Sequence, residues 1–269
     1  MKPLKTGPPM FVHIATVGVS LLQNARRELK KEKPSEDELV SFIGKDPRRA
    51  SAELNTIFPL LEENKQHQHR VYLLHSDTEE GRLCAGALEQ FISGLGLRAH
   101  ACCVEVKELG SPENFTRGLA NLLEQVVNLI RRHYAEGDRV FVHASGGFKP
   151  ETTMAFLAAN LPTTGAPVFY VHESFREMIR LPALPVWPRK RRKFVELMNR
   201  MCQAREIYPE ALQRMFGREV IEEAKRLGWI VEEGNRLKIT PMGLLLWQRF
   251  ERLGLYGSKP KPPQSIGGF

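Results

Sequence analysis

Two short motifs carry residue types that suit phosphate binding. The first, residues 16–24 (TVGVSLLQN), continues an apolar run at 10–16 that predicts a buried strand. Gly18 lets backbone amides approach a ligand closely, and Ser20 adds a hydroxyl where a helix is expected to begin. A helix N-terminus presents free N–H groups and a positive dipole end, which attract an anion. The competing interpretation is that Ser20 merely caps that helix.

The second motif, residues 145–152 (SGGFKPET), follows another apolar run at 139–144 and also opens a helix. Paired glycines free the backbone to wrap an anion, Lys149 adds a mobile cation, and Thr152 and Thr153 add hydroxyls. The motif has neither the GxxxxGK[ST] order of a Walker A loop nor the GxGxxG order of a dinucleotide-binding turn. The competing interpretation is a tight turn with a solvated lysine.

Alternating strands and helices must position these motifs. Such alternation predicts right-handed βαβ units, an α/β fold and a mainly parallel sheet. In such a sheet the ligand lies beyond the carboxyl ends of the strands, here at loops 16–20, 75–79 and 144–150. The predicted strands are 10–16, 70–75, 97–106, 139–144 and 167–172, and the predicted helices are 21–31, 35–43, 47–63, 79–94, 112–135 and 151–160.

The composition changes near Pro182, which predicts a linker followed by a small second domain. Helical patterns at 189–203, 208–216 and 217–228, a hairpin at 229–240 and a closing helix at 241–253 outline a winged helix-turn-helix. The low-complexity end predicts a disordered tail. The predicted domains are therefore 1–182, 183–256 and 257–269.

The composition indicates in which cell compartment the protein works and which kind of partner it binds. The chain has 269 residues, and its longest apolar runs are too short to span a bilayer, so no membrane association is expected. The cysteines form no CxxC pair and no set with zinc spacing, which indicates a cytoplasmic protein; they are Cys84, Cys102, Cys103 and Cys202. The net charge of +8 suggests a polyanionic partner, although much of it lies in residues 189–193 and in Lys259 and Lys261.

Residues 10–180 resemble the CARF (CRISPR-associated Rossmann-like) domain of type III CRISPR proteins, in the branch that contains ring nucleases. The strand followed by GxSLxxN and the strand followed by SGGFK carry the resemblance. It implies a Rossmann-like homodimer that binds one cyclic oligoadenylate, here cyclic tetra-adenylate, across the two-fold axis. Its catalytic roles fall on Ser20 and Lys149. The expected ligand-binding residues are Thr16, Gly18, Val19, Asn24, Ser76, Ser145, Gly146, Gly147, Phe148 and Thr152.

The implied activity is cleavage that switches off an antiviral defence signal. Each ribose 2′-OH of the ring can attack its own 3′ phosphate, so the protein needs to position the ring and stabilise charge. Lys149 would supply the charge, backbone amides at 18–20 and 146–148 would assist, and Ser20 would orient the phosphate or the 2′-OH. The expected products carry 2′,3′-cyclic phosphate ends, as from a lyase, and no metal or other cofactor is expected.

Other output activities find little support in the sequence. Arg70 and His75, the one formal Arg-x4-6-His pair, span a predicted strand, and no aspartate accompanies the Glu222–Lys225 cluster. His13, His75 and His143 are expected to be structural, although His75 and His172 end strands near the expected site.

The main alternative is a transcriptional regulator gated by the same messenger, with Arg218, Glu219 and Lys225 on a recognition helix and Arg236 and Lys238 on a wing. Glu219, Glu222 and Glu223 would repel DNA phosphate, so weak, nonspecific DNA binding is expected at most. A third alternative is a pure binder whose partner is another protein.

Overall fold

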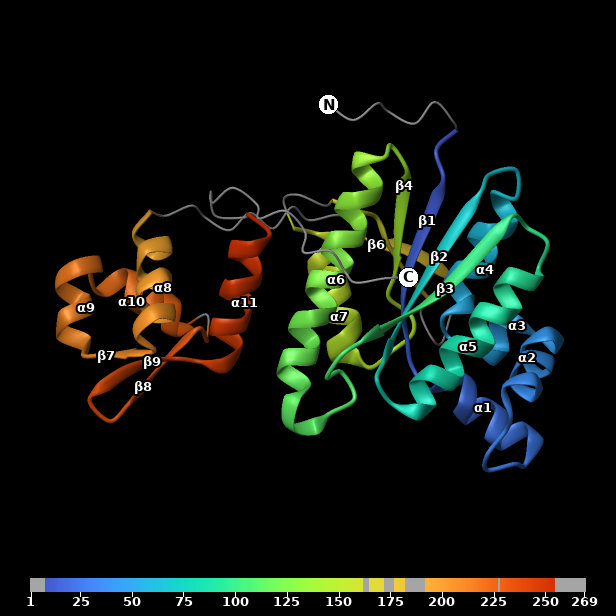
Figure 1. Cartoon of the computed structure of the whole chain (residues 1–269), viewed down its shortest axis with the longest axis horizontal. Coiled ribbons are helices and arrows are strands. Elements are labelled where there is room, and N and C mark those ends of the chain that lie inside the picture. Colours follow the sequence, from blue (N-terminus) through green and yellow to red (C-terminus); the bar gives the residue numbers. More distant parts are fainter. Residues whose placement is uncertain (1–7, 162–164, 172–176, 182–191, 227, 255–269) are drawn as a thin grey trace. The chain divides into compact units, whose positions relative to one another are not determined.

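The computed structural model describes residues 8–161, 165–171, 177–181, 192–226 and 228–254, and the chain divides into two compact units, 1–186 and 187–269 (Figure 1). The predicted domain boundary at 182/183 and the predicted tail lie outside the described residues, as do His172 and basic residues 189–191. The domain limits therefore remain predictions.

A six-stranded sheet forms the centre of the first unit, in the order β3-β2-β1-β4-β5-β6. Neighbouring strands from β3 to β5 pair in parallel, and only β6 runs antiparallel, against β5. The predicted α/β class with a mainly parallel sheet is confirmed. Strand β6 was not predicted, because a four-residue edge strand is too short to show a clear period in the sequence. The strands are β1 (Phe11–Val17), β2 (His69–Ser76), β3 (Ala99–Val106), β4 (Arg139–His143), β5 (Val168–Val171) and β6 (Met178–Leu181).

The strand order reverses between β1 and β4. β1 is buried along its whole length, as expected of a central strand covered on both faces. The order runs to β2 and β3 on one side of β1 and to β4 and β5 on the other, which is the Rossmann-like arrangement. The connections after β1 and β4 therefore leave the same edge of the sheet side by side, at the point where such folds place their ligands.

Helices cover both faces of the sheet (Figure 1). One face packs against α1, α2, α4 and α5 through residues such as Leu73, Ile43 and Leu88, and α6 and α7 cover the other face. Ser35 and Glu38 form a capping box at the start of α2. No helix in the described ranges is long and apolar enough to cross a membrane. The helices are α1 (Ser20–Leu29), α2 (Glu36–Lys45), α3 (Pro47–Ala50), α4 (Leu54–Glu63), α5 (Glu79–Gly94), the 3-10 turn η1 (Pro112–Asn114), α6 (Phe115–Ala135) and α7 (Lys149–Ala159).

The helix predicted over 47–63 is broken in the structure. Asp46 caps the single turn of α3, and the backbone is extended at Ser51 (φ −139°, ψ 137°) before α4 begins at Leu54. The apolar pattern concealed this break, because the pieces on either side of it both bury residues in the same core cluster. The break matters because it turns Glu53 inward.

The second unit is small and has its own core. Leu197, Met201, Leu212, Ile221 and Trp247 are all buried in it. The two-residue strand β7, too short to predict from the sequence, pairs with β9 beside the hairpin. The order of helices and hairpin is the one from which the winged helix-turn-helix was predicted, and that assignment remains a prediction. The elements are α8 (Arg192–Ala204), β7 (Glu206–Ile207), α9 (Pro209–Phe216), α10 (Arg218–Arg226), β8 (Ile230–Glu233), β9 (Arg236–Ile239) and α11 (Pro241–Arg252).

Three buried histidines form a hydrogen-bonded chain across the central strands. His13 Nε2 lies 3.0 Å from His69 Nδ1, and His13 Nδ1 lies 3.0 Å from His143 Nε2. His69 Nε2 donates to the Asn64 carbonyl at 2.9 Å, so each neutral ring donates through Nε2, and His13 and His69 accept through Nδ1. Burial holds the pKa of His13 well below its usual range, that of His143 at about 3, and that of His69 below normal.

These histidines should make the fold sensitive to mild acid. An unfolded histidine takes up a proton near about pH 6.5, whereas the folded rings resist it, so stability is full above that pH and is lost as the pH falls toward the folded pKa values. Each of these histidines can lower the free energy of unfolding by up to about 1.4 kcal/mol for each pH unit of acidification. Urea unfolding of the wild type at about pH 7 and about pH 5.5 should show this loss.

His143→Gln should reduce the difference between the two pH values, whereas the exposed control His100→Gln should keep it. Buried carboxyl groups titrate in the opposite sense, so comparing the variants isolates the histidine contribution. Equal pH dependence in His143→Gln and wild type would contradict the assignment.

Candidate functional site

The two predicted motifs meet at the edge of the sheet between β1 and β4. Thr16 Oγ1 donates a hydrogen bond of 2.6 Å to the Gly146 carbonyl. A Cβ on Gly18 would lie 2.8 Å from the Gly147 nitrogen, so the two backbones touch and a side chain at Gly18 has no room. Residues 16–20 and 145–149, far apart in the sequence, thus form one surface at the switch point of the sheet.

Helix α1 begins at this surface without a side-chain cap. Val19 is its N-cap residue, Ser20 is its first helical residue, and the first turn carries no acidic side chain. The Ser20 hydroxyl accepts from Ala52 N at 3.3 Å and faces Glu53 Oε2 at 3.4 Å, so it does not cap the helix. No side chain caps the positive end of this helix, and the carboxylate of Glu53 lies close to it.

A buried carboxylate that the sequence did not reveal lies behind both loops. Glu53 is 1% exposed, and its Oε1 accepts from Gly18 N at 2.8 Å. Its Oε2 accepts from the Ser51 hydroxyl at 2.5 Å. A Cβ on Gly146 would lie 2.1 Å from Glu53 Oε1, so the second loop also packs directly on this carboxylate. Burial raises the pKa of Glu53, although the donors at Ser51, Gly18 and Ser20 oppose the shift.

Glu151 is a second buried acid in the site. Its Oε2 accepts from Phe148 N at 2.9 Å and thereby caps the start of α7. Burial raises its pKa, the Phe148 amide opposes that shift, and the nearby charge of Glu53 adds to it. Two amides expected to help hold a ligand, those of Gly18 and Phe148, therefore donate to the protein's own carboxylates in this structure.

Lys149 and Phe148 form the outward part of the second loop. Phe148 is 60% exposed, and Lys149 is exposed without an ion pair among the described residues. The Lys149 carbonyl accepts from the hydroxyls of Thr152 at 3.0 Å and Thr153 at 2.7 Å. Those two hydroxyls therefore stabilise the first turn of α7, while the lysine side chain stays available.

Three other predicted ligand residues make contacts within the fold. Asn24 Nδ2 donates to the Ala50 carbonyl at 3.1 Å and so ties α1 to α3. Ser145 Oγ accepts from Val171 N at 2.9 Å, and Ser76 Oγ is hydrogen-bonded to Thr78 Oγ1 at 2.8 Å. Their additional contact with a ligand remains a prediction, as it does for the other proposed site residues.

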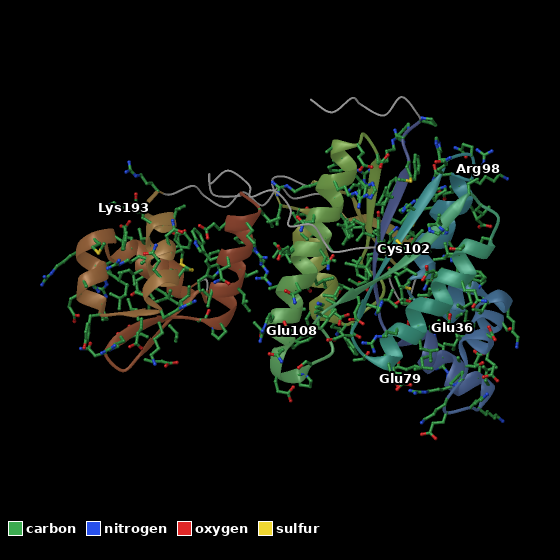
Figure 2. The ribbon with its side chains drawn as sticks, viewed as in Figure 1. Glu36, Glu79, Arg98, Cys102, Glu108 and Lys193 are labelled. Carbon is green, nitrogen blue, oxygen red and sulfur yellow. The ribbon has the colours of Figure 1, made fainter. Side chains whose placement is uncertain are left out.

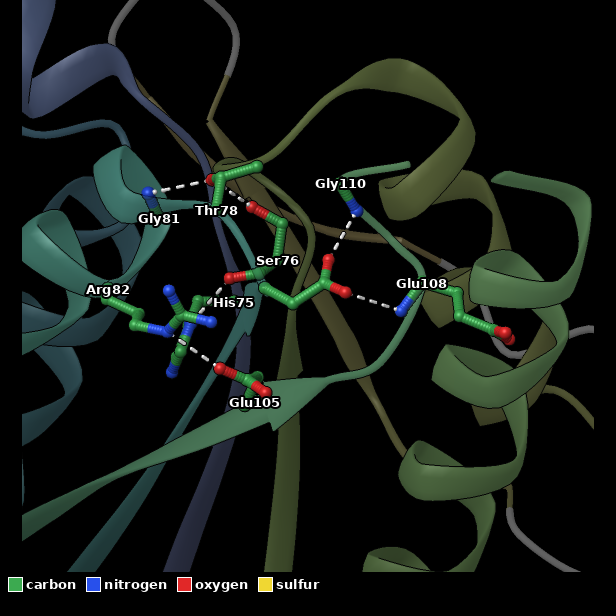
Figure 3. Close-up of polar contacts among 9 residues, drawn as sticks. His75, Ser76, Thr78, Gly81, Arg82, Glu105, Glu108 and Gly110 are labelled. Carbon is green, nitrogen blue, oxygen red and sulfur yellow. Dashed lines mark hydrogen bonds and ion pairs between the residues drawn. The ribbon is translucent and has the colours of Figure 1, made fainter. Parts of the chain in front are cut away.

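Asp77 organises the neighbouring loop after β3 (Figure 3). Its carboxylate accepts from Glu108 N at 2.8 Å and from Gly110 N at 2.7 Å. Partial burial acts to raise the pKa of Asp77, but these amide donors hold it below its usual value. Glu79 and Glu108 lie at the carboxyl end of the sheet, whereas Arg98 lies at the opposite end (Figure 2). Asp77 therefore borders the edge that carries the two motifs.

In the described part of the chain, one cluster of side chains of the kinds that bind metal ions lies away from this edge. His133 Nδ1 is 2.8 Å from Asp138 Oδ2, and Glu136 is close by. Tyr72 OH is 2.9 Å from His133 Nε2. Because Asp138 immediately precedes β4, the cluster lies at the amino ends of the strands and is not part of the candidate site.

Residues 48–184, just over half of the chain, match the family described as CRISPR-associated protein (Cas_APE2256). The chain belongs to this CRISPR-associated family. The matched range includes Glu53 and the SGGFK loop and begins after Ser20.

Solved structures show only distant likeness to this CRISPR-associated protein. Protein VC1899 from Vibrio cholerae has 12% identity and a TM-score of 0.33, covering 91% of this chain and 66% of that one. Enterococcus italicus Csm6 bound to cyclic hexa-2′-fluoro-hexa-dAMP has 14% identity and a TM-score of 0.38, covering 91% and 45%. A type III CRISPR defence DNA nuclease activated by cyclic oligoadenylate has 14% identity and a TM-score of 0.33, covering 95% and 35%. The chain thus corresponds to part of each longer protein, and scores this low carry no conclusion about its ligand.

Replacing Asp77 should release the loop after β3. Asp77→Ala removes an acceptor shared by two amides, and hydrogen bonds to charged groups contribute about 1.5–3 kcal/mol each. Hydrogen exchange at Glu108 and Gly110 should therefore accelerate. Because Asp77 is only partly buried, the free energy of unfolding should fall by about the contribution of one such bond. The exposed control Glu79→Gln should leave both amides protected. Unchanged exchange in Asp77→Ala would show that other contacts hold the loop.

Proposed function

We propose that this CRISPR-associated protein binds a cyclic oligoadenylate, with cyclic tetra-adenylate as the expected ring, and cleaves it to end the signal. The proposal rests chiefly on the uncapped N-terminus of α1 beside the exposed Lys149 at the β1/β4 switch point. Together they offer a dipole end, a hydroxyl and a cation to a phosphodiester. Family membership and the resemblance of residues 10–180 to CARF domains supply the ligand class.

The proposed reaction uses the nucleophile that the substrate already carries. The ribose 2′-oxygen attacks the adjacent phosphorus, the P–O5′ bond breaks, and a 2′,3′-cyclic phosphate and a 5′-hydroxyl remain. The protein must align the 2′-oxygen with the departing 5′-oxygen and stabilise the charge on phosphorus oxygens. Lys149 is free to move toward that charge, and Ser20 is held at the start of α1 by Ala52 and Glu53.

The second unit favours the enzyme over a regulator that reads DNA. Three of the four cations assigned to DNA contact, all but Arg218, face a carboxylate of their own unit: Lys225 lies 2.8 Å from Glu232, Lys238 lies 2.9 Å from Glu233, and Arg236 pairs with Glu206. Each would have to give up its partner to reach a phosphate. We therefore place messenger-gated DNA binding second.

We also propose a two-fold dimer, because a ring of identical repeats is best matched by a symmetric site. Light scattering of the purified protein at micromolar concentration should report the mass of two chains. The mass of one chain would contradict this part of the proposal.

Cleavage should proceed in excess EDTA. Purified protein should convert cyclic tetra-adenylate into linear products whose 2′,3′-cyclic phosphate ends are identified by mass spectrometry. A ring with 2′-methoxy groups should bind but stay intact, because the nucleophile is blocked. Dependence on a divalent metal, or plain phosphate ends formed directly from the ring, would mean that water attacks instead.

Lys149→Ala should lower the single-turnover rate of this reaction at least about tenfold, since a donor aimed at the transition state typically contributes about 2.7–4 kcal/mol. Lys65→Ala is a matched control, because it removes an exposed lysine that precedes β2, at the opposite end of the sheet. Equal rates in the two variants would show that Lys149 is only a solvated loop residue.

A further inference from the structure

Glu53 contacts both halves of the proposed site, yet the reaction described above gives it no role. It accepts the amide of Gly18 in the first loop and packs against Gly146 in the second. It also lies 3.4 Å from the Ser20 hydroxyl. Among the described residues no lysine or arginine forms an ion pair with it. Burying a carboxyl group without a cationic partner costs free energy, and such groups in proteins are typical of functional sites.

The contacts fix the direction of the Ser20 hydroxyl. Ser20 Oγ accepts from Ala52 N at 3.3 Å, which uses one of its two lone pairs. An ionised carboxylate can only accept, so the Ser20 proton points toward Glu53 Oε2 when Glu53 is ionised. The second lone pair of Ser20 Oγ then remains for a proton that comes from outside the protein. At 3.4 Å this hydrogen bond is long, and catalytic hydrogen bonds often tighten in the reacting complex.

We propose that Glu53 is a positioning residue that makes Ser20 a proton relay. Glu53 holds the Ser20 proton inward and receives it when Ser20 takes the proton of the attacking 2′-OH. This inference rests on the proposed cleavage and deepens it. A nucleophile or relay backed by a second, buried group is a recurrent catalytic arrangement.

The protons and bonds of this step balance with water as the only further reactant. The 2′-oxygen loses its proton to Ser20 Oγ while the Ser20 proton moves to Glu53 Oε2. The 2′-O–P bond forms and the P–O5′ bond breaks, and the departing 5′-oxygen takes a proton from solvent water. Glu53 later returns its proton to solvent through Ser20, which restores the starting state.

The surroundings of Glu53 suit a proton acceptor. Burial raises its pKa, which makes the carboxylate a stronger base than an exposed glutamate. The titratable groups that face it are Glu151 from α7 and Cys84 from α5. Burial raises the pKa of Cys84 to about 12, so this thiol stays neutral, and an ionised Glu151 would make Glu53 more basic still. The acceptor must be ionised, so the rate should rise as the pH passes upward through the pKa of Glu53.

Glu53→Gln tests the relay because it keeps the shape and the acceptor for Gly18 N but removes the basic oxygen. Calorimetry with the 2′-methoxy ring should show affinity within about threefold of the wild type, since binding does not need the relay. Single-turnover cleavage of cyclic tetra-adenylate should fall at least about a hundredfold, and the acidic limb of the pH–rate profile should vanish. Glu62→Gln, an exposed change on α4, should keep both rate and profile.

The outcomes separate the relay from the proposed function. If the wild type cleaves and a folded Glu53→Gln keeps the rate and the acidic limb, the relay is wrong and the function stands. If Glu53→Gln is folded but no longer binds the ring, Glu53 is a scaffold residue and the inference is overturned. If the wild type binds the ring but does not cleave it, both the relay and the proposed cleavage are wrong.

A second variant covers failure of Glu53→Gln to fold. Ser20→Ala should then remove the same acidic limb from its residual activity, because the relay passes through the Ser20 hydroxyl. An acidic limb that persists in Ser20→Ala would overturn the inference.

Discussion

The contact between the two glycine loops over Glu53 is the constraint on which the site depends. Gly18 and Gly147 touch backbone to backbone, and Gly146 packs on the Glu53 carboxylate. A side-chain carbon at Gly18 would push the loops apart, and one at Gly146 would displace the Glu53 side chain. The reversal of strand order between β1 and β4 brings these loops together, and the carboxylate holds them by accepting the Gly18 amide.

The buried polar groups of the first unit divide by their chemistry. The histidine chain is neutral and internally satisfied except for the outer nitrogen of His143, which has no partner in the described part of the chain. Glu53 and Glu151 instead hold raised pKa values at the end of the sheet where a ligand is proposed. A fold selected for stability alone would gain by replacing such acids with apolar groups, so their position at the loops is best explained by function.

The second unit distributes its charge differently. Lys225, Arg236 and Lys238 are paired with neighbouring carboxylates on the outside of the unit. Exposed ion pairs contribute little to folding. Their main effect is to reduce the positive field that a DNA-binding wing would need. This pairing therefore weakens the case for DNA contact by these three residues.

The sequence by itself determined the α/β class, five of the six strands of the main sheet, and both glycine motifs with Ser20 and Lys149. Those features have local causes: apolar runs, helix caps and glycine-rich turns show in any window that contains them. Tertiary structure alone decided that the helix over 47–63 breaks at Ser51 and that Glu53 turns under Gly18, a residue 35 positions away in the chain. It also decided that Asn24 and Ser145 form hydrogen bonds within the fold, with Ala50 and Val171. A hydrogen bond between distant segments leaves no period or spacing in the sequence, so only the folded chain could reveal the carboxylate behind the serine.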